Sequence, residues 1–171
     1  GYVSIKPIKE SLPVYASLSV DSSGSVSKEN YKAFIHSMTR AVERSSGNVK
    51  VALSKFDDEV QFVSMYSESR DGLTEKISAF ERSGKKTLLY NSVYDSIEML
   101  SKVNEGRKAV FIWTDGKDEG SSITADDVAS FAREKGIPVV FITNKNSKHI
   151  PVMKRISKIS GGTLHLIESK E

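Results

Sequence analysis

Three oxygen-bearing side chains stand at alternate positions just after an apolar stretch. Asp21, Ser23 and Ser25 are separated only by Ser22 and Gly24. In an extended loop, side chains two positions apart point to the same side, so the carboxylate and the two hydroxyls can face one point. Gly24 would allow a sharp backbone path between the two serines. The spacing predicts a small polar site, although a Ser/Gly-rich turn with Asp21 capping it locally has the same residues.

The donor atoms of this loop indicate which ion it could hold. Carboxylate and hydroxyl oxygens suit Mg2+, Mn2+ or Ca2+ rather than Zn2+ or Cu2+, and no His or Cys lies nearby in the sequence. Mg2+ takes six ligands at about 2.1 Å and keeps several waters. An ion that contacts few carboxylates directly is short of negative charge. Such an ion would accept a carboxylate from another molecule.

A second carboxylate follows another apolar run. Residues 109–114, AVFIWT, are nearly all apolar, as expected of a central parallel strand covered on both faces, and Asp115 and Gly116 come next. Taken alone, Asp115-Gly116 is a turn signal. If the two apolar strands are neighbours, however, Asp21 and Asp115 reach the same crevice.

The elements that must position these residues can be read from the periodicity. Residues 14–20 alternate apolar and polar, which predicts a strand, and Ser27 with Asn30 marks a helix N-terminus. The helix that follows has an apolar stripe and ends at 45–48. Further patterns predict strands at 49–56, 60–66, 109–114, 138–143 and 163–167, and helices at 73–80, 89–100, 124–135 and 152–159.

This alternation predicts an α/β fold. We expect a doubly wound, mostly parallel, six-stranded sheet with one antiparallel edge strand and helices on both faces. The antiparallel strand comes from a hairpin around 57–59, which reads as a solvated turn. Residues 1–12 are expected to be a lead-in segment, and 13–169 a single domain.

Composition narrows the function classes. The chain has 171 residues, a net charge of +3 with both signs interspersed, and no cysteine. The charge pattern indicates a mildly basic surface rather than a nucleic-acid patch. Without cysteine there is no disulfide, thiolate zinc site or cysteine nucleophile. No run approaches the roughly 18 apolar residues of a membrane span. The chain starts at Gly1 without a signal peptide, which suggests a piece of something longer.

Several motifs, in order, resemble one family. Asp21 to Ser25 resembles the DxSxS motif of von Willebrand factor type A domains, including the inserted domains of integrins. Thr114-Asp115-Gly116 is similar to their second acidic loop, and residues 87–91 resemble the stretch with their threonine ligand. Residues 159–163 are similar to the last helix-to-strand junction. The resemblance runs from about 14 to 167.

The resemblance implies a Rossmann-like fold and a metal-ion-dependent adhesion site. Its metal ligands would be Asp21, Ser23 and Ser25 from the first loop, Thr87 as a conditional ligand, and Asp115 directly or through water. Thr87 could instead be a helix cap. Family members often have glycine or small residues at the positions of Lys85 and Lys86. The two lysines therefore predict a basic rim around the metal site of this chain.

Other chemistries fit less well. Residues 84–87, GKKT, resemble the end of a phosphate-binding loop. The first glycine of that motif, however, is replaced here by Ala79. Phosphoryl transfer through Asp21 would want a carboxylate two residues on, where Ser23 stands. Serine hydrolysis needs a nearby base, and no His lies near these serines in the sequence. A metal hydrolase also needs a base, and the acids placed for that role are already the predicted ligands. We therefore expect no enzyme activity.

The predicted function is divalent-cation-dependent protein binding. Mg2+, or else Mn2+ or Ca2+, would coordinate an exposed Glu or Asp of a protein partner. Lys85, Lys86 and Lys117 would attract that acid, and the loop 117–123 would shape specificity. Neither nucleic acid nor direct membrane insertion is expected.

A second function class is assembly. The domain would then be a structural module of a larger membrane or ATPase-associated complex, with a vacant or non-functional metal site. The sequence does not indicate the cellular compartment directly. We expect an extracellular or membrane-anchored ectodomain.

Overall fold

The computed structural model describes residues 12–168. Residues 1–11 of the predicted lead-in, and residue 169 at the end of the predicted domain, lie outside the described residues. The elements are β1 Val14–Asp21, α2 Lys28–Arg44, β2 Val49–Phe56, β3 Val60–Met65, α3 Arg70–Ser78, α4 Leu89–Ser101, β4 Arg107–Trp113, α5 Ala125–Lys135, β5 Val139–Asn144, α6 Ile150–Ser160 and β6 Leu164–Ile167.

The sheet confirms the predicted fold class. It has six strands in the order β3-β2-β1-β4-β5-β6. All neighbouring pairs are parallel except β2 and β3, which form an antiparallel hairpin at one edge. From β1 the chain winds first to β2 on one side and later to β4 on the other. The carboxyl ends of β1 and β4 therefore flank the point where the winding reverses, which is where open α/β sheets bind ligands.

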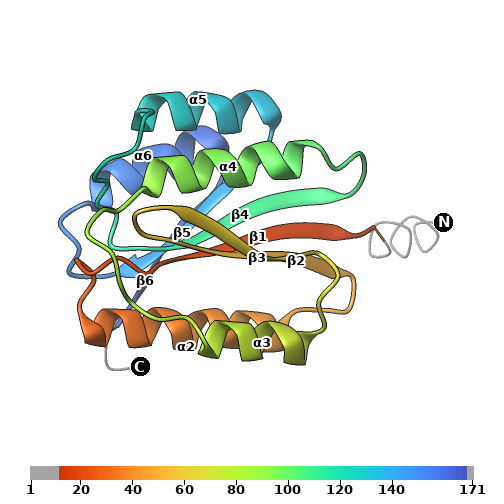
Figure 1. The fold of residues 1–171 in the computed structure, drawn as a ribbon. Helices are drawn as coiled ribbons and strands as arrows, with labels where there is room; N and C mark the ends of the chain where they lie inside the picture. Colours follow the sequence, from red (N-terminus) through yellow and green to blue (C-terminus); the bar gives the residue numbers. More distant parts are fainter. Residues whose placement is uncertain (1–11, 169–171) are drawn as a thin grey trace.

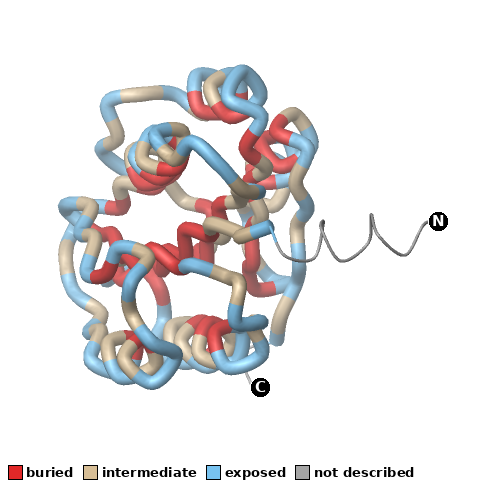
Figure 2. Tube along the Cα trace, turned by 90° about the vertical axis from the view of Figure 1, so that its right-hand side faces the viewer, coloured by how far each residue is buried: buried red, intermediate tan, exposed pale blue. Residues whose placement is uncertain are grey.

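Helices cover both faces of the sheet (Figure 1). The helices α4, α5 and α6 lie on one face, and α2 and α3 on the other. Each layer has its own apolar core, one around Leu89, Ile97 and Phe141 and the other around Phe34, Met38 and Leu53. Figure 2 shows the buried segments gathered between the layers, with exposed chain on the outer helix faces. No described helix is long and apolar enough to cross a membrane.

Three elements begin two or three residues earlier than predicted, because periodicity detects only apolar positions. The helix α3 begins at Arg70 rather than at 73, since Ser69 caps its polar first turn by accepting from the N–H of Gly72. The strand β4 begins at Arg107, two charged residues before its apolar run. The helix α6 begins at Ile150, with Pro151 in its first turn, where a missing N–H costs nothing.

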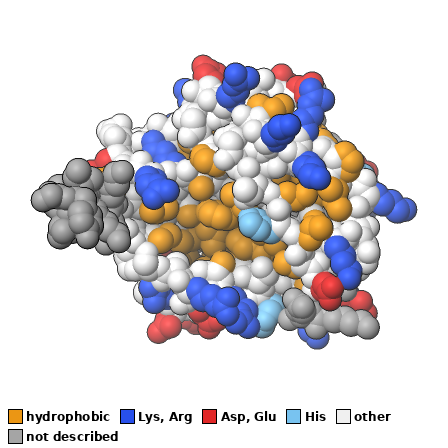
Figure 3. Space-filling model, turned by 180° about the vertical axis from the view of Figure 1, so that it is seen from behind, with side chains coloured by type: hydrophobic (Ala, Val, Ile, Leu, Met, Phe, Trp, Pro, Cys, Tyr) orange, Lys and Arg blue, Asp and Glu red, His pale blue; other side chains and the backbone are white. Residues whose placement is uncertain are grey.

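The serines of β1 are buried together with its apolar residues. Ser17 and Ser19 face α4, and the hydroxyl of Ser19 lies 3.0 Å from that of Ser92. On the opposite face, an apolar groove of about 480 Å³ lies between α2 and the strands β1, β2, β4, β5 and β6. Hydrophobic side chains gather across the middle of the molecule in the view from behind (Figure 3).

Candidate metal centre

Three loops meet at the carboxyl ends of β1 and β4, at the left of Figure 1. The first loop follows β1, the second follows β4, and the third precedes α4. The first loop is the DSSGS segment, and Ser27 then caps α2 by accepting from the N–H of Asn30, as predicted. The predicted oxygen donors all come from these three loops.

Asp21 lies at the centre and is fully buried. Its Oδ1 accepts hydrogen bonds from the backbone N–H of Ser23 at 3.1 Å and from the Ser23 hydroxyl at 2.7 Å. Its Oδ2 accepts from the hydroxyl of Thr114 at 2.8 Å, at the end of the neighbouring strand. The local turn that the sequence allowed is therefore present, and a long-range contact is added to it.

A line of hydroxyls continues from Asp21 across to the third loop. The Ser23 and Ser25 oxygens are 3.0 Å apart, and the Ser25 oxygen is 3.4 Å from that of Thr87. Asp115 is half-buried, and its Oδ1 accepts from the N–H of Lys117 at 3.1 Å. The structure thus links Asp21, Ser23, Ser25 and Thr87 in one line of contacts, and Asp115 lies close enough to Asp21 for its charge to act on that carboxyl group.

The pKa of Asp21 is raised from 3.8 to about 7. Burial is the largest cause and the negative charge of Asp115 the second, and the hydrogen bonds from Ser23 and Thr114 oppose both. A buried carboxylate next to a second one is unfavourable without a nearby positive charge. A cation between the two acids would supply that charge.

The turn between β2 and β3 holds the loop that carries Thr87. Asp58 Oδ1 accepts from the backbone N–H groups of Lys85 at 2.8 Å and Lys86 at 2.5 Å, and these bonds lower the pKa of Asp58. Asp57 is only 8% exposed, and its Oδ2 accepts from the Ser83 hydroxyl at 3.3 Å. The prediction of a solvated turn is wrong for Asp57, because tertiary contacts bury it.

The first and third loops also bind each other through their backbones. The N–H of Gly24 donates to the carbonyl of Gly84 at 3.2 Å. Arg82 donates to the carbonyls of Gly24 and Val26 at 2.9 and 2.8 Å. A Cβ at Gly24 would lie 2.8 Å from the Gly84 carbonyl oxygen. Gly24 is required for this close approach rather than for an unusual φ, since its φ is not positive.

The β4–α5 loop supports Thr87 from the other side. Thr87 and Glu119 exchange two backbone hydrogen bonds, at 3.1 and 2.8 Å. Asp118 Oδ1 accepts from the N–H of Tyr90 at 2.9 Å, in the first turn of α4. The N-cap of α4 is Leu88, without a side-chain cap. The alternative role of Thr87 as a helix cap is therefore not what the structure shows.

The donor set fits a hard divalent cation better than a transition metal. Among residues 12–168, no group of three or more His, Cys, Asp or Glu side chains is placed to hold an ion. The site has two carboxylates, and its other donors are hydroxyls. That combination suits Mg2+, which keeps part of its water shell. Of the predicted basic rim, Lys85 and Lys86 are exposed, whereas Lys117 pairs with Glu119 at 3.2 Å.

Residues 18–170 match the family model of the von Willebrand factor type A domain. The chain belongs to this family. Domains of the family generally mediate protein interactions rather than catalysis. No curated protein matches the chain in sequence.

Solved structures of the same fold come from varied proteins. A conserved hypothetical protein BatB from Bacteroides thetaiotaomicron has a TM-score of 0.75 at 14% identity, with 91% of this chain and 90% of that chain covered. The von Willebrand factor domain of the type V pili tip protein Mfa5 from Porphyromonas gingivalis has a TM-score of 0.74 at 12% identity. The match covers 94% of this chain and 91% of the Mfa5 chain.

A third structure is similar over part of a longer chain. Proximal thread matrix protein 1 from the mussel byssus, with a zinc-occupied metal-ion-dependent adhesion site, has a TM-score of 0.79 at 16% identity. The match covers 94% of this chain and 43% of the mussel protein's chain. At these identities the likeness shows the fold alone.

Sequence reasoning missed the residues that hold the site together. Asp58, Arg82 and Asp118 bind backbone groups of other loops, and no local pattern marks such contacts. Thr114 had a usable signal, because it is the last residue before Asp115 at the end of a buried strand. A polar residue at that position of a parallel strand belongs to the crevice.

Proposed function

We propose that this domain binds a divalent cation, Mg2+ in the first place, through Asp21, Ser23, Ser25, Thr87 and Asp115. The bound ion coordinates an exposed Glu or Asp of a protein partner. The observation that carries this proposal is the line of contacts from Asp21 through two serines to Thr87, beside a second acid.

The hydrogen bonds at Asp21 leave the hydroxyls free to ligate. The Ser23 hydroxyl donates its hydrogen bond to Asp21, so its oxygen lone pairs remain available for a cation. Thr114 likewise donates a hydrogen bond to the other oxygen of Asp21 and orients the carboxylate. The bound cation would supply a Lewis-acidic position that attracts an outside carboxylate.

The surroundings favour an acidic partner. Lys85 and Lys86 are exposed at the rim of the Thr87 loop and form no ion pair within residues 12–168, so their charges are available to steer an approaching acid. Exposed charges of this kind raise the association rate and add little affinity. The coordination bond would therefore carry most of the affinity.

The alternative is an assembly module whose metal site is not used. One observation favours it: the hydroxyls of the site can hydrogen-bond to one another, since those of Ser23, Ser25 and Thr87 lie within hydrogen-bonding distance. Such a network can hold the loops without an ion. Direct measurement of ion binding separates the two functions.

The decisive experiment is calorimetric titration of the domain with Mg2+, Mn2+ and Zn2+. We expect saturable Mg2+ binding in the wild type, and its loss in Asp21→Asn and in Ser25→Ala. Ser25 is exposed, so its replacement should leave the fold intact. Asp71→Asn, on the exposed first turn of α3, is the matched control and should bind like the wild type. Absence of ion binding in the wild type would favour the assembly role.

Partner binding can then be tested without knowing the partner. Immobilised domain should retain proteins from a lysate in Mg2+ and release them in EDTA, and Asp21→Asn should retain none of them. Retention that is equal in Mg2+ and EDTA would contradict a metal-dependent role.

A further inference from the structure

A polar pocket lies beside Asp115, at the loop between β5 and α6. It has a volume of about 210 Å³ and is lined by Asn30, Asp115, Asn144, Asn146, Ser147, Lys148 and His149. Most of these residues belong to the loop between β5 and α6. The proposed ion ligands include only Asp115 from this set, so the pocket is a separate feature of the same surface.

The pocket wall is fixed by its own hydrogen bonds. Asn144 is 4% exposed; its Nδ2 donates to Asn30 Oδ1 at 3.0 Å, and its Oδ1 accepts from the N–H of Asn146 at 2.9 Å. The Ser147 hydroxyl donates to the backbone carbonyl of Asp115. The β5–α6 loop is thereby attached to both α2 and the metal loop, and the pocket is preformed.

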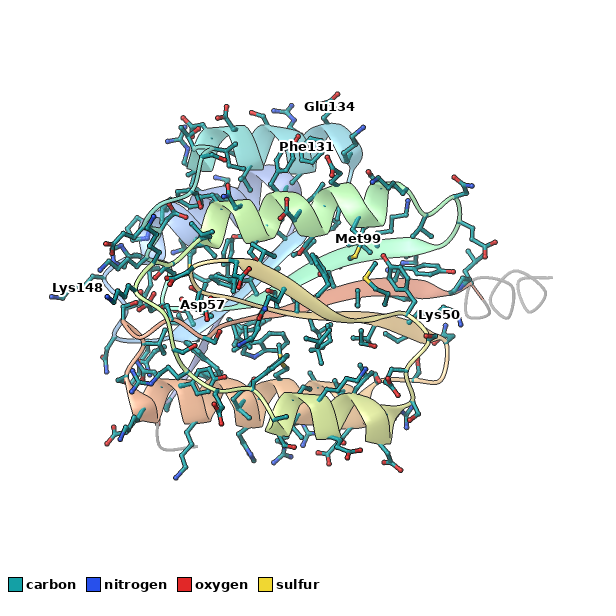
Figure 4. The ribbon with its side chains drawn as sticks, in the orientation of Figure 1. Lys50, Asp57, Met99, Phe131, Glu134 and Lys148 are labelled. Carbon is teal, nitrogen blue, oxygen red and sulfur yellow. The ribbon has the colours of Figure 1, made fainter. Side chains whose placement is uncertain are left out.

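Three residues that line the pocket can still donate hydrogen bonds, and Asp115 is the one acid among the lining residues. Within residues 12–168, the side-chain N–H groups of Asn30 and Asn146 have no hydrogen-bond acceptor and Lys148 has no ion pair. Figure 4 shows Lys148 extending from the end of the molecule where the strand-end loops gather. Amide N–H groups and an ammonium group together recognise a carboxylate.

We propose that this pocket binds a second acidic side chain of the protein partner, two or three residues from the acid that coordinates the ion. The proposal rests on the proposed metal-dependent function. It makes the domain selective for paired acids over a single acid. Lys85 and Lys86 do not offer the same recognition, because they are exposed and do not line this pocket.

The charge of Asp115 makes this second contact depend on the ion. Without a cation, Asp115 at the pocket wall repels a carboxylate. With a divalent cation bound, the charges of Asp21 and Asp115 are balanced, and Lys148 gives the pocket a net positive charge. Selectivity for paired acids should therefore disappear in EDTA.

The test uses short synthetic peptides as probes. Two di-acid peptides, Ac-Gly-Glu-Gly-Glu-amide and Ac-Gly-Glu-Gly-Gly-Glu-amide, are compared with versions whose second Glu is Gln, by nitrogen-15 NMR titration in Mg2+ and in EDTA. In Mg2+ we expect at least one di-acid peptide to bind about fivefold tighter than its Gln version, with shifts at the side-chain amides of Asn30 and Asn146.

Variants separate this inference from the proposed function. Lys148→Ala and Asn146→Ala should remove the di-acid advantage and leave Mg2+ affinity and single-acid binding unchanged. Lys154→Ala, an exposed lysine further along α6, is the control with the same charge change and should keep the advantage. Equal binding of di-acid and Gln peptides to the wild type would overturn the inference while leaving metal-dependent acid binding in place. Failure of every peptide to bind in Mg2+ would overturn both.

Discussion

The hydroxyl of Thr114 lies 2.8 Å from Oδ2 of Asp21, across two adjacent parallel strands. With Ser23 bonded to Oδ1, both oxygens of a fully buried carboxylate are engaged at the crevice. The bonds orient Asp21 but do not offset its burial and the nearby Asp115, and its pKa rises to about 7. Two predictions depend on that proton.

The first prediction concerns stability without metal. The folded domain keeps a proton on Asp21 up to about pH 7, whereas the unfolded chain releases it near 3.8. This stabilisation is fully present below the unfolded pKa and is lost as the pH rises through the folded pKa. In EDTA, the melting temperature of the wild type should fall more between about pH 5 and about pH 8 than that of Asp21→Asn. Identical pH dependence of the two proteins in circular dichroism melts would contradict this.

The second prediction concerns ion binding. A cation must displace the proton of Asp21, so Mg2+ affinity should decrease as the pH falls below about 7. Calorimetry near neutral pH in two buffers of different ionisation enthalpy should reveal proton release on binding. The same apparent heat in both buffers would mean that Asp21 is already ionised.

The third prediction concerns Asp58, whose carboxylate accepts from two backbone N–H groups next to Thr87. Its replacement by Ala should release the Thr87 loop and weaken Mg2+ binding several-fold. Glu59→Ala is the control in the same turn, because the Glu59 side chain is exposed and forms no hydrogen bond or ion pair within residues 12–168. If both variants bind Mg2+ equally well, the turn does not position Thr87.

The fourth prediction concerns Asp118, which accepts from the N–H of Tyr90 in the first turn of α4. Asp118→Ala leaves that N–H without its acceptor and should reduce stability by about 1 kcal/mol, the usual effect of losing a helix cap. Chemical denaturation measures the loss. Glu119→Ala removes only an exposed ion pair with Lys117 and should change stability little.

The fifth prediction concerns Gly116, whose φ is +87°. A Cβ there would lie 2.7 Å from Met153 Cε and 2.8 Å from His149 Cβ. Gly116→Ala should therefore destabilise the domain by about 2 kcal/mol and displace Asp115, so that Mg2+ affinity also falls. Gly47→Ala meets no atom within 4 Å and should be nearly neutral. Wild-type stability of Gly116→Ala in denaturant titrations would show that the loop can relax.

The order and type of the elements were determined by the sequence alone. Apolar periodicity distinguishes strands from helices, and an uninterrupted apolar run such as AVFIWT indicates a strand buried on both faces. The three motifs that carry the family resemblance are short and local, so the five proposed ligands could be chosen before any coordinates. The helix N-terminus at Ser27 was also readable, because its capping bond spans only three residues.

Only the tertiary structure decided what surrounds those ligands. The burial of Asp57, the anchoring of the Thr87 loop by Asp58, and the pocket beside Asp115 depend on backbone groups from segments distant in the sequence. Any residue supplies a backbone N–H or carbonyl, so such contacts leave no trace in residue types. The raised pKa of Asp21 likewise depends on burial and on Asp115, and neither exists until β1 and β4 pair.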